Sequence, residues 1–220
     1  MTNQAVENYL KCIYSLSQRA EGPISTNAIA EGLDTKPSSV TDMLKKLKTK
    51  KLVAYEKYQG ASLTKKGEAI AINIIRKHRL WEVFLVEKLG FGWEEVHDIA
   101  EQLEHIKSPQ LVRRLDEFLD NPTVDPHGDP IPDADGNMII DPEVIPLAKL
   151  ETGEHGVIMG VKDSSPSFLT YLQEVNLVLG SQLEVANRFD FDQSLSVKNG
   201  DGAMHVSAKV GENLLVKKIN

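Results

Sequence analysis

The chain has 220 residues, 41% of them hydrophobic, which suits one large domain or two to three small ones. No apolar run approaches the length of a membrane span, and the opening residues, MTNQAVENYLKC, lack the basic and apolar regions of an export signal. The single cysteine, Cys12, excludes an intrachain disulfide, so we expect a protein of the reducing cytoplasm with no membrane partner.

The net charge of −7 conceals an asymmetry along the chain. Residues 1–80 hold fourteen Lys and Arg against seven Asp and Glu, whereas residues 81–220 hold eleven against twenty-five. A basic N-terminal part favours contact with a polyanion such as nucleic acid. The acidic remainder either attracts cations or forms a solvated surface, and charge alone leaves both readings open.

The N-terminal elements follow the order of a winged helix-turn-helix. Apolar spacing predicts helices over 4–20, 26–33 and 37–51, and two strand-like runs within 52–64 flank a turn at Gln59-Gly60. Pro37 suits the first turn of the third helix, where its missing N–H costs nothing.

The third helix and the hairpin are the candidate DNA-binding elements. Small hydroxyl residues at a recognition-helix N-terminus can approach phosphates and base edges, while lysines supply salt-dependent contacts to the backbone. The alternative is a three-helix scaffold with a solvated lysine face. The residues expected at the DNA are Lys36, Pro37, Ser38, Ser39, Thr41, Asp42 and Lys45 on the helix, and Lys57, Tyr58 and Gln59 on the wing.

The rest of the chain divides into a helical part, a loop and a β-rich part. Amphipathic patterns predict helices over 65–90, from 95 to about Leu111, and over 109–121. Residues 121–147 are rich in Pro, Asp and Gly, which indicates a linker or ordered loop. Five short strand-like runs and one short helix then predict a small β-barrel over 148–220.

The stretch EVHDIAEQLEHIKS, residues 95–108, carries imidazoles and carboxylates at helical spacing. His97, Glu101, Glu104 and His105 stand at i, i+4, i+7 and i+8, so one helix would present them on one face. A second pair with one-turn spacing, His78 and Glu82, lies on the preceding predicted helix. Such donors suit Mn²⁺, Fe²⁺, Co²⁺, Ni²⁺ or Zn²⁺.

Two other interpretations of these residues stay open at this stage. A His-Glu pair is often a surface ion pair, and a hydrolytic metal site uses similar residues. No HExxH, GxSxG or P-loop pattern is present, so we expect no enzyme.

Several segments together resemble the metal-dependent repressors related to the diphtheria toxin repressor, and more closely their manganese transport regulator branch. They are ENYLKCIY, KPSSVTDMLKKL, LVAYEKYQGASLTKKG, RKHRLWEVFL, HDIAEQLEHIKS and PHGDPIP. The resemblance covers nearly the whole chain. It implies an α+β protein with a winged helix-turn-helix over 1–64, a helical dimerisation and metal-binding domain over 65–143, and an SH3-like barrel over 144–220, like that of iron-transport accessory proteins.

The resemblance also implies a function and its residues. A homodimer would bind operator DNA when loaded with Mn(II), or alternatively Fe(II), and repress metal-uptake genes; Zn(II), Co(II) or Ni(II) would bind in vitro. A less favoured alternative is a metal-independent regulator. The implied ligands are Asn8, Glu101, Glu104 and His105 at one site, and His78, Glu82, His97, His127, Asp125 and Asp163 at a second.

Four positions depart from or refine the family pattern. Asn8 stands where manganese-type members have Asp and iron-type members have Met. Ser165 and Phe168 stand where some iron-type members place barrel ligands, which shifts that role to Asp163. Glu101 stands where iron-type members have a cysteine, and the absence of that soft ligand favours manganese.

Overall fold

The computed structural model describes residues 3–200 and 202–219, which form two compact units, each assembled from several stretches of the chain. The first unit comprises Met1–His78, Glu101–Val112 and Pro132–Met138. The second comprises Arg79–Ala100, Arg113–Ile131 and Ile139–Asn220. Residues 101–112 therefore pack with the N-terminal elements, although they follow the long helix in sequence.

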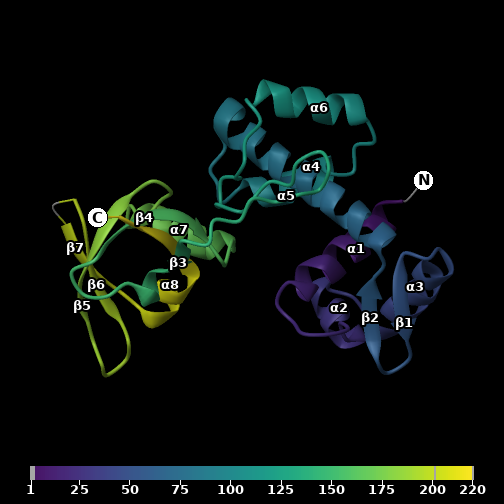
Figure 1. Ribbon diagram of the computed structural model, residues 1–220, viewed down its shortest axis with the longest axis horizontal. Helices are drawn as coiled ribbons and strands as arrows, with labels where there is room; N and C mark the ends of the chain where they lie inside the picture. The colour runs from purple at the N-terminus through teal and green to yellow at the C-terminus, as the bar shows by residue number, and fades with distance from the viewer. Residues whose placement is uncertain (1–2, 201, 220) are drawn as a thin grey trace. The chain divides into compact units, whose positions relative to one another are not determined.

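The first unit contains the predicted winged helix-turn-helix (Figure 1). Its elements are α1 (Gln4–Ser17), α2 (Thr26–Gly32), α3 (Pro37–Thr49), β1 (Val53–Glu56) and β2 (Gly60–Leu63). Asn3 and Ser25 cap the first two helices through their side chains, as short polar residues do at helix N-termini. Asp34 takes a φ of 45° in the turn before α3, a left-handed conformation that Asp tolerates.

One apolar core holds these elements together. Leu10, Leu44 and Leu47 are completely buried in it, and strand β1 adds Val53. Burying one such leucine stabilises the fold by roughly 1.5–3 kcal/mol. Because this face of α3 is buried, its opposite face, with the serines and lysines, is left for solvent or a ligand.

Helix α4 (Lys65–Leu89) is the long helix that the sequence predicts. It stops where Gly90 adopts a φ of +73°, a conformation that favours glycine. Residues up to His78 belong to the first unit and residues from Arg79 to the second.

Helix α5 (Val96–Leu103) is shorter than predicted, and α6 (Pro109–Phe118) follows it. The chain turns after Leu103, whose carbonyl accepts from Ile106 N–H at 3.1 Å. Pro109 opens α6 and disfavours a helical conformation at Ser108, so one continuous helix cannot run to Leu111. Glu104 and His105 therefore lie in a turn, and the prediction that four ligands share one helix face was wrong.

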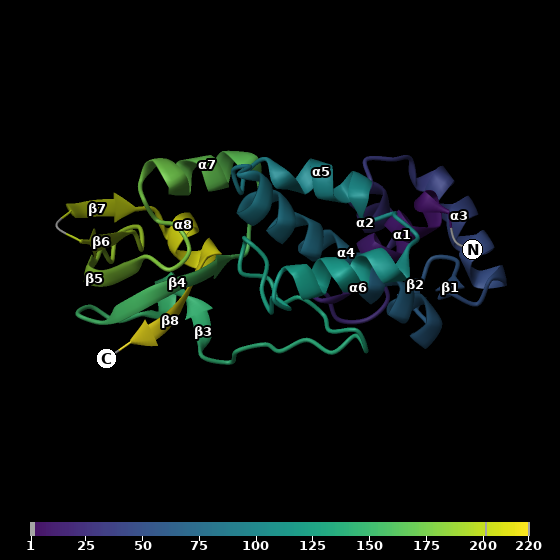
Figure 2. The ribbon, with the colours of Figure 1, turned by 90° about the horizontal axis from the view of Figure 1, so that it is seen from above.

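The C-terminal part is an antiparallel sheet of six strands in the order β3-β8-β4-β5-β6-β7, which confirms the predicted α+β class. The strands are β3 (Val144–Pro146), β4 (His155–Val161), β5 (Gln182–Arg188), β6 (Leu195–Asn199), β7 (Gly202–Val206) and β8 (Leu214–Ile219). A 3₁₀ turn, η1 (Leu147–Lys149), follows β3. Figure 2 shows α7 (Pro166–Glu174) across one face, where Leu169 and Leu172 enter the sheet core.

Two details of this part differ from the prediction. The short strand β3 adds a sixth strand. The run MHVSAKV, predicted as one strand, divides into the end of β7 and the start of α8 (Ala208–Asn213), because Ser207 caps the helix by accepting from Val210 N–H. Among the described residues no helix is both long and apolar enough to cross a membrane.

Candidate metal centre

Three segments of the first unit bring charged and imidazole side chains together, and we call this group the primary cluster. Helix α1 contributes Glu7 and Lys11, helix α4 contributes Lys77 and His78, and the end of α5 with the following turn contributes Glu101, Glu104 and His105. Glu7, Glu104, His78 and Lys77 are buried, which is unusual for ionisable side chains outside a paired or functional group.

Glu104 is the centre of the primary cluster and is only 1% exposed. Its Oε2 atom lies 2.6 Å from His78 Nδ1 and 2.7 Å from Lys11 Nζ. Lys77 also donates to the backbone carbonyl of Glu104. Burial raises the pKa of Glu104, but the hydrogen bond from His78 and the charge of Lys11 outweigh burial, so that this pKa lies below its ordinary value.

His105 is oriented by Glu7, a residue that the sequence reasoning missed. Its Nδ1 atom lies 2.7 Å from Glu7 Oε2, and its Nε2 atom lies 3.7 Å from Glu104 Oε1. The carboxylate of Glu7 selects the tautomer that carries its proton on Nδ1, so the Nε2 lone pair faces Glu104. This carboxylate–imidazole arrangement is typical of histidines that bind a metal through the other ring nitrogen.

Asn8 supplies the observation that tests whether a cation fits here. Its Oδ1 atom is buried and has no hydrogen-bond partner among the described residues. A buried amide oxygen without a partner costs free energy, so such atoms need an explanation in a native fold. Asn8 directly follows Glu7 on α1, and a carbonyl oxygen left in this state fits a ligand for a divalent cation.

A second cluster lies in the other unit and consists of Glu82, Asp125 and His127, all buried. One ligand atom from each residue can be chosen so that all lie within 4.8 Å of one another. His127 Nδ1 is 3.7 Å from Glu82 Oε2, and His127 Nε2 is 2.8 Å from the Trp93 carbonyl. Glu82 comes from α4, and the other two come from the loop after α6, so the fold joins residues more than forty positions apart in sequence.

The PHG segment that carries His127 is fixed against the sheet. The His127 carbonyl accepts from Val161 N–H at 2.9 Å, and a Cβ at Gly128 would lie 2.1 Å from the Met159 carbonyl oxygen. The close approach and a φ of +86° make glycine necessary at this position. The sheet therefore holds the loop that presents His127 to Glu82.

Burial and charge perturb the protonation of the second cluster strongly. Burial, followed by the negative charge of Glu82, raises the pKa of Asp125 to about 7. Burial lowers the pKa of His127, but the Glu82 carboxylate outweighs burial and raises it to about 9. In the absence of a metal, a protonated His127 neutralises part of this acidic group, as a bound cation would.

Two further predicted ligands, His97 and Asp163, lie outside this group of three, and His97 contacts it. His97 on α5 is half-buried, and its Nδ1 atom lies 3.5 Å from Glu82 Oε1. Asp163 is separate from the three-residue group: its carboxylate accepts from Ser165 N–H at 2.9 Å and lines a pocket of about 430 Å³ with Ser165 and Phe168. The structure thus brings His97 to the second cluster and leaves Asp163 in a neighbouring part of the sheet domain.

The predicted DNA-binding residues form an exposed face of α3 and the wing. Lys36, Pro37, Ser38 and Ser39 are exposed at the start of α3. Further residues of the set are engaged locally: Thr41 donates to the Pro37 carbonyl and Lys45 pairs with Asp42. On the wing, Tyr58 is 93% exposed with Lys57 over its ring, and Gln59 is exposed beside it.

Comparison with known proteins identifies the family. Residues 1–61 match the iron-dependent repressor N-terminal DNA-binding domain, residues 64–133 match the metal-binding and dimerisation domain of the same family, and residues 145–218 match the FeoA domain. A solved structure described as a manganese-dependent transcriptional repressor in complex with manganese superposes with a TM-score of 0.85 at 33% identity, over 97% of this chain and 100% of that one. The chain belongs to the iron-dependent repressor family.

Two curated relatives illustrate the range of the iron-dependent repressor family. The iron-dependent repressor IdeR of Mycobacterium tuberculosis is 40% identical over 126 residues, which cover 57% of this chain and 54% of that protein. The regulator MntR of Oceanobacillus iheyensis is 38% identical over 119 residues, which cover 54% of this chain and 80% of that protein. The matched stretch thus spans about half the length of the mycobacterial relative.

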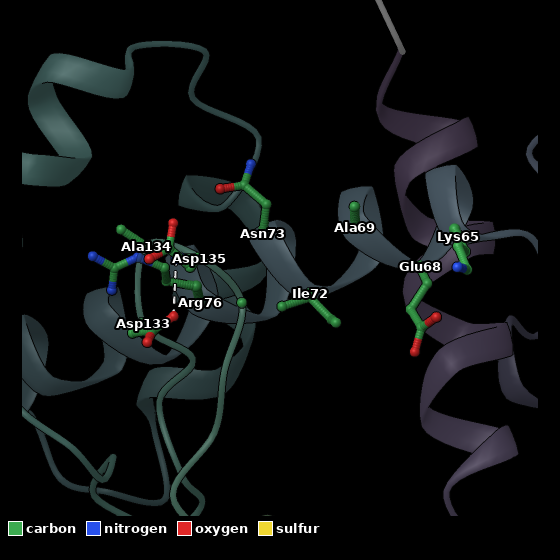
Figure 3. A pocket seen from close by; sticks show the side chains of 10 residues that line it. Lys65, Glu68, Ala69, Ile72, Asn73, Arg76, Asp133, Ala134 and Asp135 are labelled. Atoms are coloured by element: carbon green, nitrogen blue, oxygen red, sulfur yellow. Dashed lines mark hydrogen bonds between the residues drawn. The ribbon is translucent and has the colours of Figure 1, made fainter.

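A pocket of about 290 Å³ lies beside α4 and differs from both clusters in chemistry (Figure 3). Asp133 and Asp135 line it together with Lys65 and the buried Arg76, which donates to the Pro132 carbonyl at 3.1 Å. Its lining residues include no imidazole or thiol, and basic side chains already accompany its carboxylates. The donor chemistry of a transition-metal site is therefore found in the two clusters and not in this pocket.

Proposed function

We propose that this chain is a transcriptional repressor that binds operator DNA as a homodimer when it is loaded with Mn(II), and that it controls genes for metal-ion uptake in the cytoplasm. The observation that carries the proposal is the primary cluster. Its oxygen and nitrogen donors come from α1, which is part of the DNA-binding domain, and from residues 101–105, which follow the long helix. A cation held there would connect the two segments.

The residues that would hold this cation are Asn8, Glu101, Glu104 and His105, and His78 stands beside them. When bound, the cation would supply positive charge to the carboxylates of Glu101 and Glu104. Glu7 orients His105 towards the site, and burial keeps water away from Glu104. The metal can favour the DNA-binding conformation only to the extent that it binds that conformation more tightly than others.

The donor set favours Mn(II) over the other candidates. All four proposed primary ligands offer oxygen or imidazole nitrogen, and Glu101 takes the place of a thiolate. Oxygen and imidazole donors suit Mn(II). Zn(II), Co(II) and Ni(II) would nevertheless bind the same ligands at least as tightly in vitro. Fe(II) is the alternative, since relatives named as iron-dependent and as manganese-dependent are both similar to this chain.

A second metal position is proposed at Glu82, Asp125 and His127, with His97 at its edge. Its support is the burial of three ionisable side chains in one small group. Asp163 is proposed as a further ligand through the family resemblance alone. The loop that carries Asp125 and His127 packs on the sheet domain, so that loading of this position would connect α4 to that domain.

A mobility-shift titration tests the proposed function. The full chain is titrated onto a palindromic promoter fragment in Mn(II), Fe(II), Zn(II) or chelator, and we expect tight binding with metal and weak binding in chelator. Equal DNA affinity in chelator would establish a metal-independent regulator instead. Glu104→Ala should remove the metal response and leave a dimer by light scattering, and Glu184→Ala in the sheet domain serves as the control.

A further inference from the structure

The amino group of Lys11 occupies the position in the primary cluster where a cation would be expected. Its Nζ atom lies 2.7 Å from Glu104 Oε2, 3.4 Å from Glu101 Oε1 and 3.2 Å from His78 Nδ1. Glu101 and Glu104 are proposed ligands of the primary cluster, and His78 is a ligand that the family resemblance implies for the second site. The Lys11 side chain is only 17% exposed, so the ammonium group is held inside the cluster and does not extend into solvent.

Charge compensation gives this placement a physical role. Glu104 is almost fully buried, and a buried carboxylate without a counter-ion strongly destabilises a fold, because the charge has lost its hydration. Lys11 supplies the counter-ion from α1 and thereby joins the same two segments that a metal would join. A divalent cation bound to the Glu104 carboxylate would repel the ammonium group of Lys11, which lies 2.7 Å from Oε2 of the same carboxylate, so cation binding opposes the Lys11–Glu104 ion pair.

We propose that Lys11 is a built-in competitor of the metal: its ammonium group neutralises Glu104 in the metal-free protein and leaves when a divalent cation binds. The proposal rests on the metal-binding function proposed above. A lysine suits this role because its charge is carried on a flexible four-carbon chain. Glu101 is 51% exposed at the mouth of the cluster, which gives the displaced side chain a route to solvent.

The competition sets the metal concentration at which the cluster fills. The observed metal affinity is lower than the intrinsic affinity of the ligands, because binding must first break the Lys11–Glu104 ion pair. Removal of the Lys11 charge should therefore raise the metal affinity and lower the stability of the metal-free protein. A purely structural lysine would change stability without tightening metal binding.

Amine labelling of the wild-type chain tests the displacement directly. The full-length protein is treated with an N-hydroxysuccinimide ester in chelator and in Mn(II), and the acylation of each lysine is measured by mass spectrometry. We expect the labelling of Lys11 to rise several-fold with Mn(II), while the exposed Lys45 stays constant as an internal reference. Unchanged or lower labelling of Lys11 in protein that calorimetry shows to be Mn-loaded would overturn the proposal.

Two variants test the consequence for affinity. Lys11→Met keeps the chain length and removes the charge, and we expect it to bind Mn(II) about tenfold more tightly and to melt several degrees lower in chelator. Lys11→Arg keeps the charge and should show no gain in affinity. Equal or weaker binding by folded Lys11→Met would contradict the proposal. Failure of the wild-type chain to bind any metal would instead contradict the proposed function, so the two failures are distinguishable.

Discussion

Glu7 Oε2 accepts a hydrogen bond from His105 Nδ1 at 2.7 Å, across 98 positions of sequence. The contact joins α1 to the turn after α5, and both side chains are largely withdrawn from solvent. It determines which nitrogen of His105 carries the proton and therefore which one can bind a cation. Glu7 is not itself a proposed ligand, but it orients His105, which is.

The first prediction concerns this contact. Glu7→Gln keeps the size of the side chain but weakens its preference for the Nδ1-protonated tautomer of His105. We expect the Mn(II) affinity to fall roughly 10- to 100-fold, as is common when the partner of a ligating histidine is changed. Isothermal titration calorimetry measures the change. Glu31→Gln on the exposed side of α2 is the matched control, and an equal loss in that variant would indicate a general charge effect.

Asn8 provides a prediction in which stability and affinity move in opposite directions. Its buried Oδ1 atom lacks a partner in the described structure, so Asn8→Ala should leave the metal-free protein as stable or up to about 1–3 kcal/mol more stable. The same change removes a proposed ligand and should weaken Mn(II) binding. Denaturant unfolding in chelator and calorimetry with Mn(II) measure the two effects. Unchanged metal affinity would exclude Asn8 as a ligand.

A substitution at the same position tests the charge of the ligand. Asn8→Asp adds a negative charge to the primary cluster, which should raise Mn(II) affinity, because a carboxylate compensates a divalent cation better than an amide does. It should also lower the melting temperature in chelator, because the added charge would be partly buried next to the buried carboxylate of Glu7. Thermal melts with and without Mn(II) should therefore differ more for Asn8→Asp than for the wild type. A smaller metal-dependent shift would contradict this.

The DNA-binding face gives a prediction about salt. Lys36 is exposed at the start of α3, where a phosphate contact would form. Lys36→Ala should weaken operator binding in Mn(II) similarly for related sequences, and should reduce the slope of log affinity against log salt by about 1. Lys162→Ala, an exposed lysine of the sheet domain, should leave the slope unchanged. Fluorescence anisotropy over a salt series distinguishes the two variants.

The second cluster predicts how the metal-free protein responds to pH. The pKa of His127 is raised to about 9 in the folded chain, against about 6.5 when unfolded. The folded state therefore binds the proton more tightly, and its contribution to stability, complete below pH 6.5, is lost as pH rises towards 9. The pKa of Asp125 is also raised, to about 7, so this group likewise lowers the stability of the folded state as pH rises from about 4 to 7.

We accordingly expect the melting temperature in chelator to decrease between pH 6.5 and 9. His127→Asn should flatten the part of this decrease that lies above about pH 8, where an Asp125 with a pKa of about 7 is already largely ionised. His155→Asn, at an exposed position on β4, is the control and should retain the wild-type slope. A wild-type melting temperature that is constant over this range would show that His127 does not hold its proton as proposed.

The local elements follow from the sequence because their causes are local. Apolar spacing, helix caps and a left-handed turn at Asp34 determine the helices of the winged helix-turn-helix, and each acts within a few residues. Apolar spacing failed as a guide after Leu103, because α5 ends there and a new helix begins at Pro109, with the Ser108 side chain as its cap. It failed again at Ser207, where strand β7 has ended and the Ser207 hydroxyl group caps the N-terminus of α8.

The sequence by itself determined the fold class, the family resemblance and most of the proposed ligands. The spacing of the histidines and carboxylates can be read directly from the sequence, because histidine is rare in this chain. Only the tertiary structure decided which of them meet. It placed His78 against Glu104, brought Glu7 to His105 and put the ammonium group of Lys11 against Glu104. These contacts depend on packing between segments that are far apart in sequence. The local sequence around a helical Lys or Glu does not indicate which distant residue it will contact.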